Sequence, residues 1–462
     1  MKKAAFLLIV IVLITALASC DLLFVQYLDG YNENMEYTCK DRGGHIYLTT
    51  EERISCTTLE VTNECSFCSE KEVTTKTVTA NHDFVDDVCT RCGEGVPDSV
   101  GLKFALEGDG YVLTSIGSCT DKNVRIPATY DSLPVIGIAD SAFKYSNIES
   151  VKIPDSITSI GSYAFSTCSS LVSVIIPDTV SKIGDYAFYS CTALESIFVD
   201  AENEHYKSID GDLYTFDGKV LLKYAGAKLE ENVVIPEGVE KIESFAFSGA
   251  GNMVTVTIPE SVTSVEYGAF VSCKSLTEII VAVGNPVYTA EAGDLYRDEG
   301  KTLLQYAVGK KGYAVSIPSG VETVAPYAYY DADNINAIYV SNTVVEFGEY
   351  SFYGCDILVA VYMSDSVRTI GTQAFSNCPY LMQVLLGAGT ETIGDKAFFD
   401  AYFPLRVLYK GDATQWMEVN RGSNAFGLFF GGYTVYYYSE TAPDSIIGYY
   451  WYLDSNGQPK LW

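Results

Sequence analysis

The chain has 462 residues, and because 48% are hydrophobic and only 19% are charged, it can bury a large core. Its formal net charge of −29 at pH 7 argues against binding nucleic acid or an anionic membrane surface through general electrostatics. Length alone would suggest about three domains. The chain repeats itself, however, and a repeat array grows without a single core.

Residues 1–19 are typical of a lipoprotein signal peptide. Two lysines precede an apolar run from Ala4 to Ala16, and small residues lead directly to Cys20. This pattern resembles the bacterial lipobox. The resemblance implies cleavage before Cys20, acylation of its thiol, and anchoring on the outer face of a membrane through the acyl chains alone. The alternative is an ordinary signal peptide with a chance cysteine; the apolar run is short for a spanning helix.

Residues 20–97 are predicted to form a separate cysteine-rich module without the repeat. Its Cys-x-x-Cys pairs, Cys65 with Cys68 and Cys89 with Cys92, have nearly the spacing of a zinc ribbon. Four thiolates would hold one structural zinc, the only cofactor that we expect. Oxidation to disulfides is the alternative, because the expected compartment is extracellular. Val73–Ala80 alternates Val and Thr and predicts a strand.

Residues 98–137 are predicted to cap the amino-terminal end of the repeats. Leu102–Leu106 and Tyr111–Ile116 flank Gly108-Asp109-Gly110, a hairpin signal. A solenoid must close its first open face with an atypical element. We therefore expect a hairpin here, with Cys119 packed in the cap.

Residues 138–410 repeat with a fixed period. We use as the marker the aromatic residue that follows Ala in the repeated Ala-Phe pair. The markers are Phe143, Phe165, Phe188, Phe247, Phe270, Tyr329, Phe352, Phe375 and Phe398. Their spacings are 22, 23, 59, 23, 59, 23, 23 and 23, and 59 is 23 plus 36. A period in this range predicts a solenoid of stacked coils, with the markers inside.

Each repeat contains two apolar lines. The Ile-Gly-x-x-Ala-Phe line, as at Ile160–Phe165, predicts a tight turn followed by a short helical or 3₁₀ turn. The Leu-x-x-Val-x-Ile-Pro line, as at Leu171–Pro177, predicts a strand ended by proline. Three residues after five of the markers stands a cysteine: Cys168, Cys191, Cys273, Cys355 and Cys378. Other repeats have Ser or Ala at this position, so we expect a ladder of buried, unbridged thiols.

The two long spacings predict matching insertions at about 200–234 and 282–316. Asn203 and Tyr206 correspond to Asn285 and Tyr288, and Asp212-Leu213-Tyr214 corresponds to Asp294-Leu295-Tyr296. We interpret each insertion as a β-hairpin grafted on the solenoid.

Residues 411–462 lose the repeat and are predicted to form a carboxy-terminal cap. Its aromatic residues and the strand Thr434–Tyr438 would close the core, and Asn456-Gly457 predicts a last hairpin.

The repeats resemble the BspA-like (Treponema-type) branch of leucine-rich repeat proteins. The residues that carry the resemblance are Ile160-Gly161, Ala164-Phe165, Cys168, Leu171, Ser173-Val174, Ile176-Pro177 and Val180, with their counterparts in later repeats. The resemblance implies a curved leucine-rich-repeat solenoid on a bacterial surface. It also implies, for some members, adhesion to host matrix proteins or to other cells.

The strands offer a candidate binding face. Ten residues after each marker lies a position predicted to point outward, and it is occupied by Ile175, Phe198, Thr257, Ile280, Tyr339, Tyr362, Leu385 and Leu408. We expect Ile175, Phe198, Ile280, Tyr339, Tyr362 and Leu385 to bind an extracellular protein or glycan, because exposed apolar stripes mark interaction sites. The alternatives are plain strand propensity, or a stripe covered by a hairpin or by self-association.

Catalysis is not expected. The three histidines, His45, His82 and His205, lie outside the regular repeats, and no catalytic or phosphate-binding motif is present. Two functions remain. One is a lipid-anchored surface protein whose solenoid binds ligands in adhesion. The other is a structural envelope protein, in which the repeats are a spacer and the cysteine-rich module makes the specific contact.

Overall fold

A computed structural model describes the strand segments 47–53, 58–65, 71–77, 84–85 and 88–89, and residues 98–462 apart from 402, 428–431 and 442–448. The chain divides into two compact units, Met1–Pro97 and Asp98–Trp462. Cys20, Cys68 and Cys92 lie outside the described residues. Cys65 and Cys89 end strands whose backbone alone is described.

The first unit contains an antiparallel sheet in the order β1 (Tyr47–Arg53), β2 (Thr58–Cys65), β3 (Lys71–Thr77). β4 (Phe84–Val85) and β5 (Val88–Cys89) form a separate antiparallel pair. The predicted strand Val73–Ala80 overlaps β3, and its last three residues lie outside the described residues.

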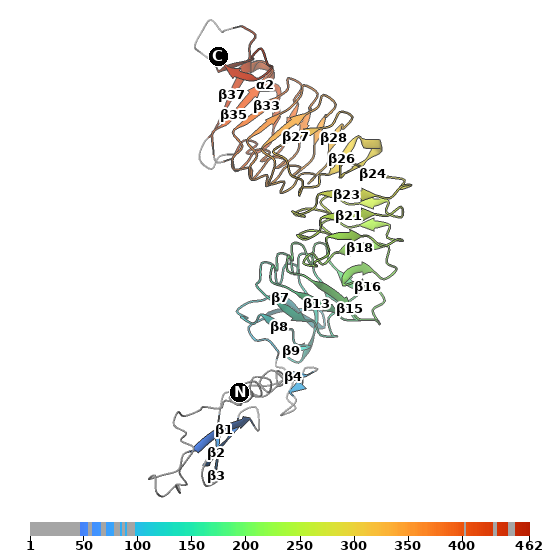
Figure 1. Cartoon of the computed structure of the whole chain (residues 1–462), viewed down its shortest axis with the longest axis vertical. Coiled ribbons are helices and arrows are strands. Elements are labelled where there is room, and N and C mark those ends of the chain that lie inside the picture. Colours follow the sequence, from blue (N-terminus) through green and yellow to red (C-terminus); the bar gives the residue numbers. More distant parts are fainter. Residues whose placement is uncertain are drawn as a thin grey trace, which may run out of the picture. The chain divides into compact units, whose positions relative to one another are not determined.

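The second unit is a curved β-solenoid with two lines of parallel strands, which Figure 1 shows following one another along the unit. A coil here means one turn of the solenoid, named by its marker. The long strands are β8 (Asn123–Arg125), β11 (Ser150–Lys152), β13 (Ser173–Ile176), β15 (Ser196–Val199), β19 (Asn232–Val234), β21 (Thr255–Ile258), β23 (Glu278–Val281), β27 (Ala314–Ile317), β29 (Ala337–Val340), β31 (Ala360–Tyr362), β33 (Gln383–Leu386), β35 (Leu405–Tyr409) and β37 (Tyr433–Tyr438).

The second line consists of shorter strands on the other side of the core. They are β7 (Gly110–Ser115), β10 (Leu133–Ile138), β12 (Ser159–Ile160), β14 (Lys182–Ile183), β18 (Val220–Lys223), β20 (Lys241–Ile242), β22 (Ser264–Val265), β26 (Thr302–Gln305), β28 (Thr323–Val324), β30 (Glu346–Phe347), β32 (Thr369–Ile370), β34 (Thr392–Ile393) and β36 (Asn420–Arg421). Both lines break at the two insertions, between β15 and β19 and between β23 and β27 in the long-strand line. The breaks divide the solenoid into three segments.

The marker rings stack inside the core, as the period predicts. The stacks run Phe143–Phe165–Phe188 in the first segment, Tyr224–Phe247–Phe270 in the second, and Tyr306–Tyr329–Phe352–Phe375–Phe398–Phe426 in the third. Adjacent ring centroids are 4.4 Å (Tyr329–Phe352) to 5.4 Å (Phe165–Phe188) apart. Stacked pairs contribute about 0.5–1.5 kcal/mol beyond the burial of their area.

The stacks correct two predictions from the sequence. Each 36-residue piece is a complete coil with its own marker, Tyr224 or Tyr306, which stands 23 residues before the next marker. The repeat also continues past Phe398, because Phe426 stacks on it at 5.2 Å. This last coil has 28 residues, from 398 to 426, and its additional length accommodates helix α2 (Ala413–Glu418), which Asp412 caps.

The turn before each marker is not the helical or 3₁₀ turn predicted. It consists of successive tight turns, as in the hydrogen bonds from Ala164 N to Gly161 O and from Ser166 N to Tyr163 O. Residues two before and two after each of the nine markers found in the sequence have positive φ, for example Tyr163 at 58° and Thr167 at 59°. A left-handed residue interrupts a helix, so the chain bends around the marker. Glycine is needed at Gly184 for space, since a Cβ would collide with the backbone amide of Ser162.

The cysteine ladder is confirmed, and the structure supplies its reason. Each of the five cysteines is free and buried, and its Sγ donates to the carbonyl oxygen of the marker one coil earlier. The distances are 3.1 Å from Cys168 to Phe143 O and 3.0 Å from Cys191 to Phe165 O. Burial raises the pKa of the Cys191 and Cys273 thiols to about 12. These thiols are therefore protonated donors rather than nucleophiles.

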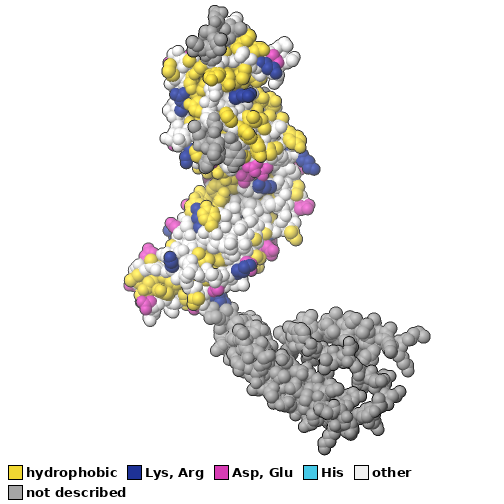
Figure 2. All heavy atoms as spheres, turned by 90° about the vertical axis from the view of Figure 1, so that its left-hand side faces the viewer, with side chains coloured by type: hydrophobic (Ala, Val, Ile, Leu, Met, Phe, Trp, Pro, Cys, Tyr) yellow, Lys and Arg dark blue, Asp and Glu magenta, His cyan; other side chains and the backbone are white. Residues whose placement is uncertain are grey.

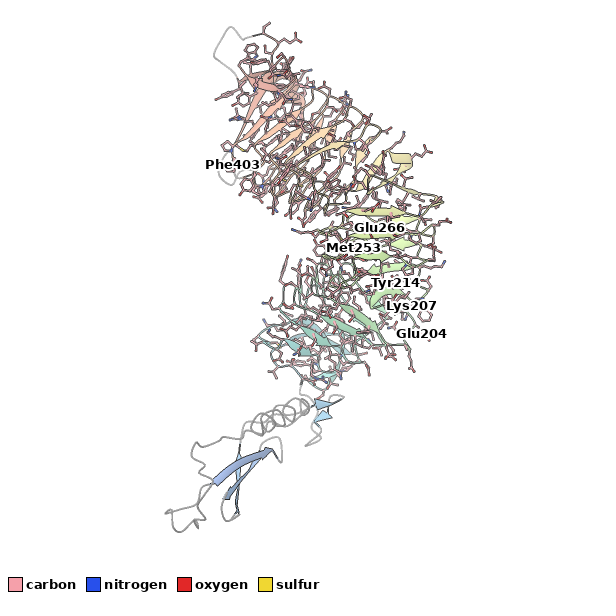
Figure 3. All side chains as sticks on the ribbon, in the orientation of Figure 1. Glu204, Lys207, Tyr214, Met253, Glu266 and Phe403 are labelled. Atoms are coloured by element: carbon pink, nitrogen blue, oxygen red, sulfur yellow. The ribbon has the colours of Figure 1, made fainter. Side chains whose placement is uncertain are left out.

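Each insertion begins with an antiparallel hairpin: β16 (Tyr206–Ile209) with β17 (Asp212–Thr215), and β24 (Tyr288–Glu291) with β25 (Asp294–Arg297). Figure 3 labels Lys207 and Tyr214 on the first of them, and Glu204 just before it. The hairpin does not stand outside the solenoid as predicted. A third strand, β18 or β26, pairs with the hairpin on one side and with the next short strand of the solenoid on the other. The short 3₁₀ helix η2 (Asp298–Gly300) joins β25 to β26.

An asparagine, buried in the first insertion and half-buried in the second, holds each hairpin to the preceding coil. Asn203 Nδ2 donates to Pro177 O at 2.7 Å and Val180 O at 3.0 Å, and its Oδ1 accepts from the backbone amides of His205 and Tyr206, both at 2.8 Å. Asn285 makes the four equivalent bonds in the second insertion. This arrangement explains why Asn and Tyr recur three residues apart.

The hairpins also satisfy the edges of the interrupted sheets. The Tyr206 hydroxyl accepts a hydrogen bond from Ile183 N on β14, and the Tyr288 hydroxyl accepts one from Val265 N on β22. On the long-strand side, Gly211 O accepts from Ile197 N at 2.7 Å. Each of these groups at the ends of the sheets is thus paired, as buried polar groups require.

A second repeated interaction, made by a buried aspartate, links the end of each hairpin to the coil that it belongs to. The Asp212 carboxylate accepts from Ala225 N at 2.8 Å and pairs with Lys228 at 2.7 Å. Asp294 does the same with Ala307 N and Lys310. Burial raises the pKa of Asp212 to about 6 despite the lysine beside it.

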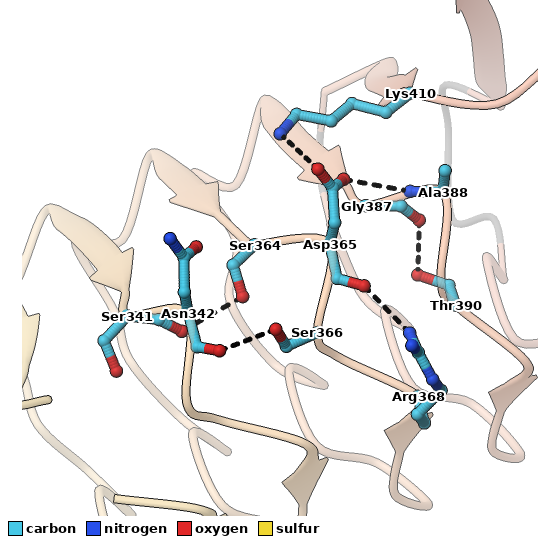
Figure 4. A network of polar contacts seen from close by, with 10 residues as sticks. All are labelled: Ser341, Asn342, Ser364, Asp365, Ser366, Arg368, Gly387, Ala388, Thr390 and Lys410. Carbon is cyan, nitrogen blue, oxygen red and sulfur yellow. Dashed lines mark hydrogen bonds and ion pairs between the residues drawn. The ribbon is translucent and has the colours of Figure 1, made fainter. Parts of the chain in front are cut away.

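The turns that follow the long strands are linked from coil to coil by polar side chains (Figure 4). The Asp365 carboxylate accepts from Ala388 N at 3.2 Å and pairs with Lys410, also at 3.2 Å. Arg368 donates to the carbonyl oxygens of Asp365 and Gly389. Such bonds fix neighbouring turns against each other, and so the long strands stay in register.

Both predicted cap regions contain a terminal hairpin, and each also contains strands of the solenoid. In the first, β6 (Lys103–Glu107) and β7 form the expected hairpin, β9 (Thr129–Tyr130) pairs with β10, and Cys119 packs against the core. In the second, β38 (Tyr450–Leu453) and β39 (Pro459–Leu461) form the last hairpin.

Candidate binding face

The outward position of the long strands is exposed along much of the solenoid, as predicted. The exposed fraction of the side chain is 61% at Ile175, 53% at Phe198, 39% at Ile280 and 44% at Tyr339. The neighbouring strand residues Val174 and Ile176 are buried, so the alternation of a one-sided strand holds. Among the polar residues at or just before the start of the long strands, Glu195 and Glu278 are also exposed, whereas Asn336 and Gln383 are half-buried.

The outward side chains form three groups rather than one stripe, because the long-strand line breaks twice. Ile175 lies in register with Phe198 on β13 and β15, and Thr257 with Ile280 on β21 and β23. The third group is the longest and runs Tyr339, Tyr362, Leu385, Leu408 and Tyr436 across β29 to β37. The rings of Tyr339 and Tyr362 stack at 5.0 Å with an interplanar angle of 7°.

Leu385 was predicted to be exposed, and this is wrong. Leu385 and Leu408 are buried in a small cluster with Trp451 on β38. The Trp451 ring is fully buried, and its Nε1 donates to Tyr409 O at 3.0 Å. The carboxy-terminal hairpin therefore covers this end of the face. Tyr362, beside the cluster, is half-buried, and desolvation raises the pKa of its hydroxyl.

The third segment carries further exposed apolar side chains that the outward position does not predict. Val359, Met382, Tyr380 and Phe403 lie in the turns that lead into its long strands. Tyr380 and Phe403 are 6.2 Å apart, and Val359 and Met382 are joined by a backbone hydrogen bond. With Tyr339 they form what we call the apolar patch. Figure 2 shows hydrophobic side chains gathered most densely on this carboxy-terminal part of the visible face.

Sequence reasoning missed four of the five patch residues, because it followed only one position of the repeat. The signal was available seven residues after the marker, where Val359 and Met382 stand in place of the Glu195 and Asn336 of other coils.

Within the described residues, no group of three or more His, Cys, Asp or Glu side chains could hold a metal ion. The side chains of Cys65, Cys68, Cys89 and Cys92 lie outside those residues, so the zinc site stays a prediction. None of the helices in the described part of the chain has the length and hydropathy needed to span a bilayer.

The model of the BspA-type leucine-rich repeat region matches the chain in six copies, over residues 136–218, 223–288 and 310–408. No curated protein matches the sequence.

Solved structures with the same kind of fold include a leucine-rich cell surface protein from Faecalibacterium prausnitzii. It is 23% identical, and the match covers 70% of this chain and 98% of that one with a TM-score of 0.39. The pneumococcal vaccine antigen PcpA is 15% identical, over 74% and 93% of the two chains, with a TM-score of 0.39. A leucine-rich repeat protein of T. pallidum is 20% identical, over 61% and 88%, with a TM-score of 0.25.

Proposed function

The chain belongs to the BspA-type leucine-rich repeat family, whose members are generally bacterial cell-surface proteins with a non-enzymatic binding scaffold, and we propose that it binds a protein partner through the apolar patch. The observation that carries the proposal is the exposure of two tyrosines, a phenylalanine, a methionine and a valine on adjacent coils. Aromatic residues and methionine are enriched in interface cores, and such contiguous exposure is uncommon on a surface that stays in water.

An exposed patch that extends over several coils suits a protein rather than a small molecule. Tyr339 projects from the long-strand sheet and the other patch residues from the turns that lead into it. The turns that follow these strands are linked by the Asp365 and Arg368 contacts. Little conformational entropy is then lost when a partner docks, because the surface is already ordered. The expected role is adhesion between the bacterium and an extracellular protein on another surface.

The test is an adhesion assay with beads that carry the full chain. Beads are applied to immobilised extracellular matrix proteins and to whole cells, and retention is measured with wild-type chain and with the Tyr339→Ala/Tyr362→Ala and Tyr380→Ser/Met382→Ser variants. We expect at least a tenfold loss of affinity with unchanged circular dichroism, because truncating interface aromatics typically costs about 1 kcal/mol or more. Phe198→Ser is the matched control, since Phe198 occupies the same strand position in the first segment. Equal retention by all variants would contradict the proposal.

The alternative is a spacer role, in which the cysteine-rich module makes the specific contact. Comparing beads that carry residues 21–97 with beads that carry residues 98–462 separates the two functions. Retention by the first fragment alone would refute binding by the solenoid.

We further propose acylation at Cys20 and one structural zinc held by Cys65, Cys68, Cys89 and Cys92. The support is the sequence pattern alone: small residues before Cys20, and two Cys-x-x-Cys pairs at a zinc-ribbon spacing. Mass spectrometry of the mature amino terminus tests the first, and elemental analysis for about one zinc per chain tests the second. Disulfides between these cysteines, without metal, would contradict the zinc site.

A further inference from the structure

A cleft of about 340 Å³ opens at the break between the first and second segments. The turn of the Phe188 coil and the turn of the Phe247 coil provide its two sides, and strands β17 and β18 of the insertion complete it. The lining residues that matter are Asp185, Tyr186, Tyr189, Lys223, Glu243 and Phe245.

The cleft exists because the intervening coil lacks the usual turn. Two residues before the marker, neighbouring coils place aromatic rings that pack against each other, such as Tyr163 and Tyr186, whose centroids are 5.1 Å apart at an interplanar angle of 43°. In the Tyr224 coil this position is Leu222, which belongs to the extended strand β18. Phe245 therefore meets Tyr186 at 5.1 Å and Tyr189 at 5.0 Å across the gap, and three rings line the space that is left.

The polar residues that line the cleft include both a hydrogen-bond donor and hydrogen-bond acceptors. Lys223 is 4% exposed, and its Nζ donates to Ser248 O at 2.9 Å. Within the described part of the chain this is its one hydrogen bond, although an ammonium group carries three donors. Burial lowers the pKa of Lys223 to about 8, which reflects how poorly its charge is solvated. Asp185 and Glu243 contribute carboxylates at the more exposed edge of the cleft, where Glu243 also pairs with Lys241 at 2.8 Å.

We propose that this cleft binds a neutral sugar unit. Sugar hydroxyls both donate and accept, so they can bond to the carboxylates of Asp185 and Glu243 and accept from Lys223. The C–H face of a sugar ring can pack on the electron-rich faces of Tyr186 and Phe245. The volume of about 340 Å³ lies in the range of small-ligand sites.

Other ligand classes fit less well. An acidic ligand would meet the Asp185 carboxylate on a chain with a net charge of −29, and Glu243 is already paired with Lys241. An amine would meet the Lys223 ammonium, and an apolar ligand would leave the spare Lys223 donors without acceptors. The site is separate from the apolar patch, which lies in the third segment.

The second break provides a matched comparison. Gln305 takes the position of Lys223, and its amide donates to both Tyr306 O and Ala328 O. The Phe245 ring packs against Gly268 at φ +73°, where a Cβ would lie 2.8 Å from the ring. The equivalent place therefore offers no spare donor, and the proposal concerns the first break alone.

The experiment is isothermal titration calorimetry of the full chain. The probes are glucose, galactose, mannose and N-acetylglucosamine at millimolar concentrations. We expect at least one sugar to bind, Phe245→Ala and Lys223→Met each to weaken it about tenfold or more, and Tyr350→Ala and Gln305→Met to bind as wild type does. Tyr350 occupies the same turn position as Phe245, and Gln305 the same strand position as Lys223.

A variant at the rim keeps the test valid if either core variant unfolds. Ser244→Trp would fill the cleft from its half-exposed edge without disturbing the marker stack. Loss of binding in this variant supports the site. Binding by Ser244→Trp equal to wild type, equal losses in the control variants, or no heat from any of the four sugars would overturn it.

Discussion

Replacing Asn203 by alanine should uncouple the first two segments of the solenoid. The Asn203 side chain is 1% exposed and makes four hydrogen bonds to backbone groups of two different coils. Each bond contributes about 0.5–1.5 kcal/mol net, and the alanine side chain leaves two carbonyls and two amides without their partner. Allowing for partial rehydration, we expect the free energy of unfolding to fall by about 2–4 kcal/mol.

Urea unfolding followed by circular dichroism measures the loss, and amide hydrogen exchange locates it. Because repeat arrays are coupled through nearest neighbours, the exchange of His205, Tyr206 and the adjoining β14 amides should accelerate most. Asn252→Ala is the control: this exposed asparagine also bonds to carbonyls of a neighbouring coil, and its replacement should cost about 0.5 kcal/mol or less. If Asn203→Ala loses no more than Asn252→Ala does, the hairpin is not held in the way described.

Iodoacetamide at pH 8, followed by peptide mass spectrometry of the native full chain, should modify Cys119 and leave Cys168, Cys191, Cys273, Cys355 and Cys378 unmodified, because the ladder thiols are buried; modification of a ladder cysteine before unfolding would contradict the assignment. Lys223→Met should raise the unfolding free energy at pH 7 by roughly 2 kcal/mol, the desolvation penalty of the buried ammonium less the hydrogen bond that is lost. The lowered pKa of Lys223, about 8 against 10.5, makes the native state bind fewer protons than the unfolded state between these values. The wild-type penalty, about 3 kcal/mol below pH 8, is therefore relieved as the pH rises toward 10.5, and loss of the Ser248 bond offsets about 1 kcal/mol of the gain. Urea unfolding at pH 7 and pH 10 checks the sign, and an advantage that grows with pH would contradict it.

The period of the marker residues was enough to predict the solenoid, its inward rings and its unbridged cysteines. These features follow from local spacing, because each coil buries the same side chains against its neighbours. The Tyr224 and Tyr306 markers could have been found by counting 23 residues back from Phe247 and Tyr329. They were missed because tyrosine follows Lys223 and Gln305 there, rather than the alanine of the regular repeat.

Whether an outward residue is exposed or covered could not be predicted from the same spacing. Leu385 and Ile175 occupy one position of the repeat, yet Leu385 is covered by Trp451, which belongs to the carboxy-terminal hairpin beyond the last coil. The cleft beside Lys223 likewise depends on residues from three coils. Both features arise from contacts between a regular coil and a part of the chain that departs from the repeat, and the period of the repeat does not predict such contacts.

Asn203 and Asn285 mark the ends of a longer repeating block of the solenoid. The interval along the chain from Asn203 to Asn285 is the same as that from Asp212 to Asp294, from Tyr224 to Tyr306 and from Lys228 to Lys310. The block between these two asparagines therefore starts and finishes with the same joint, so removing one block, or adding another, would bring together surfaces that already fit. The length of this solenoid can thus change in whole blocks during evolution, with no new interface to be invented.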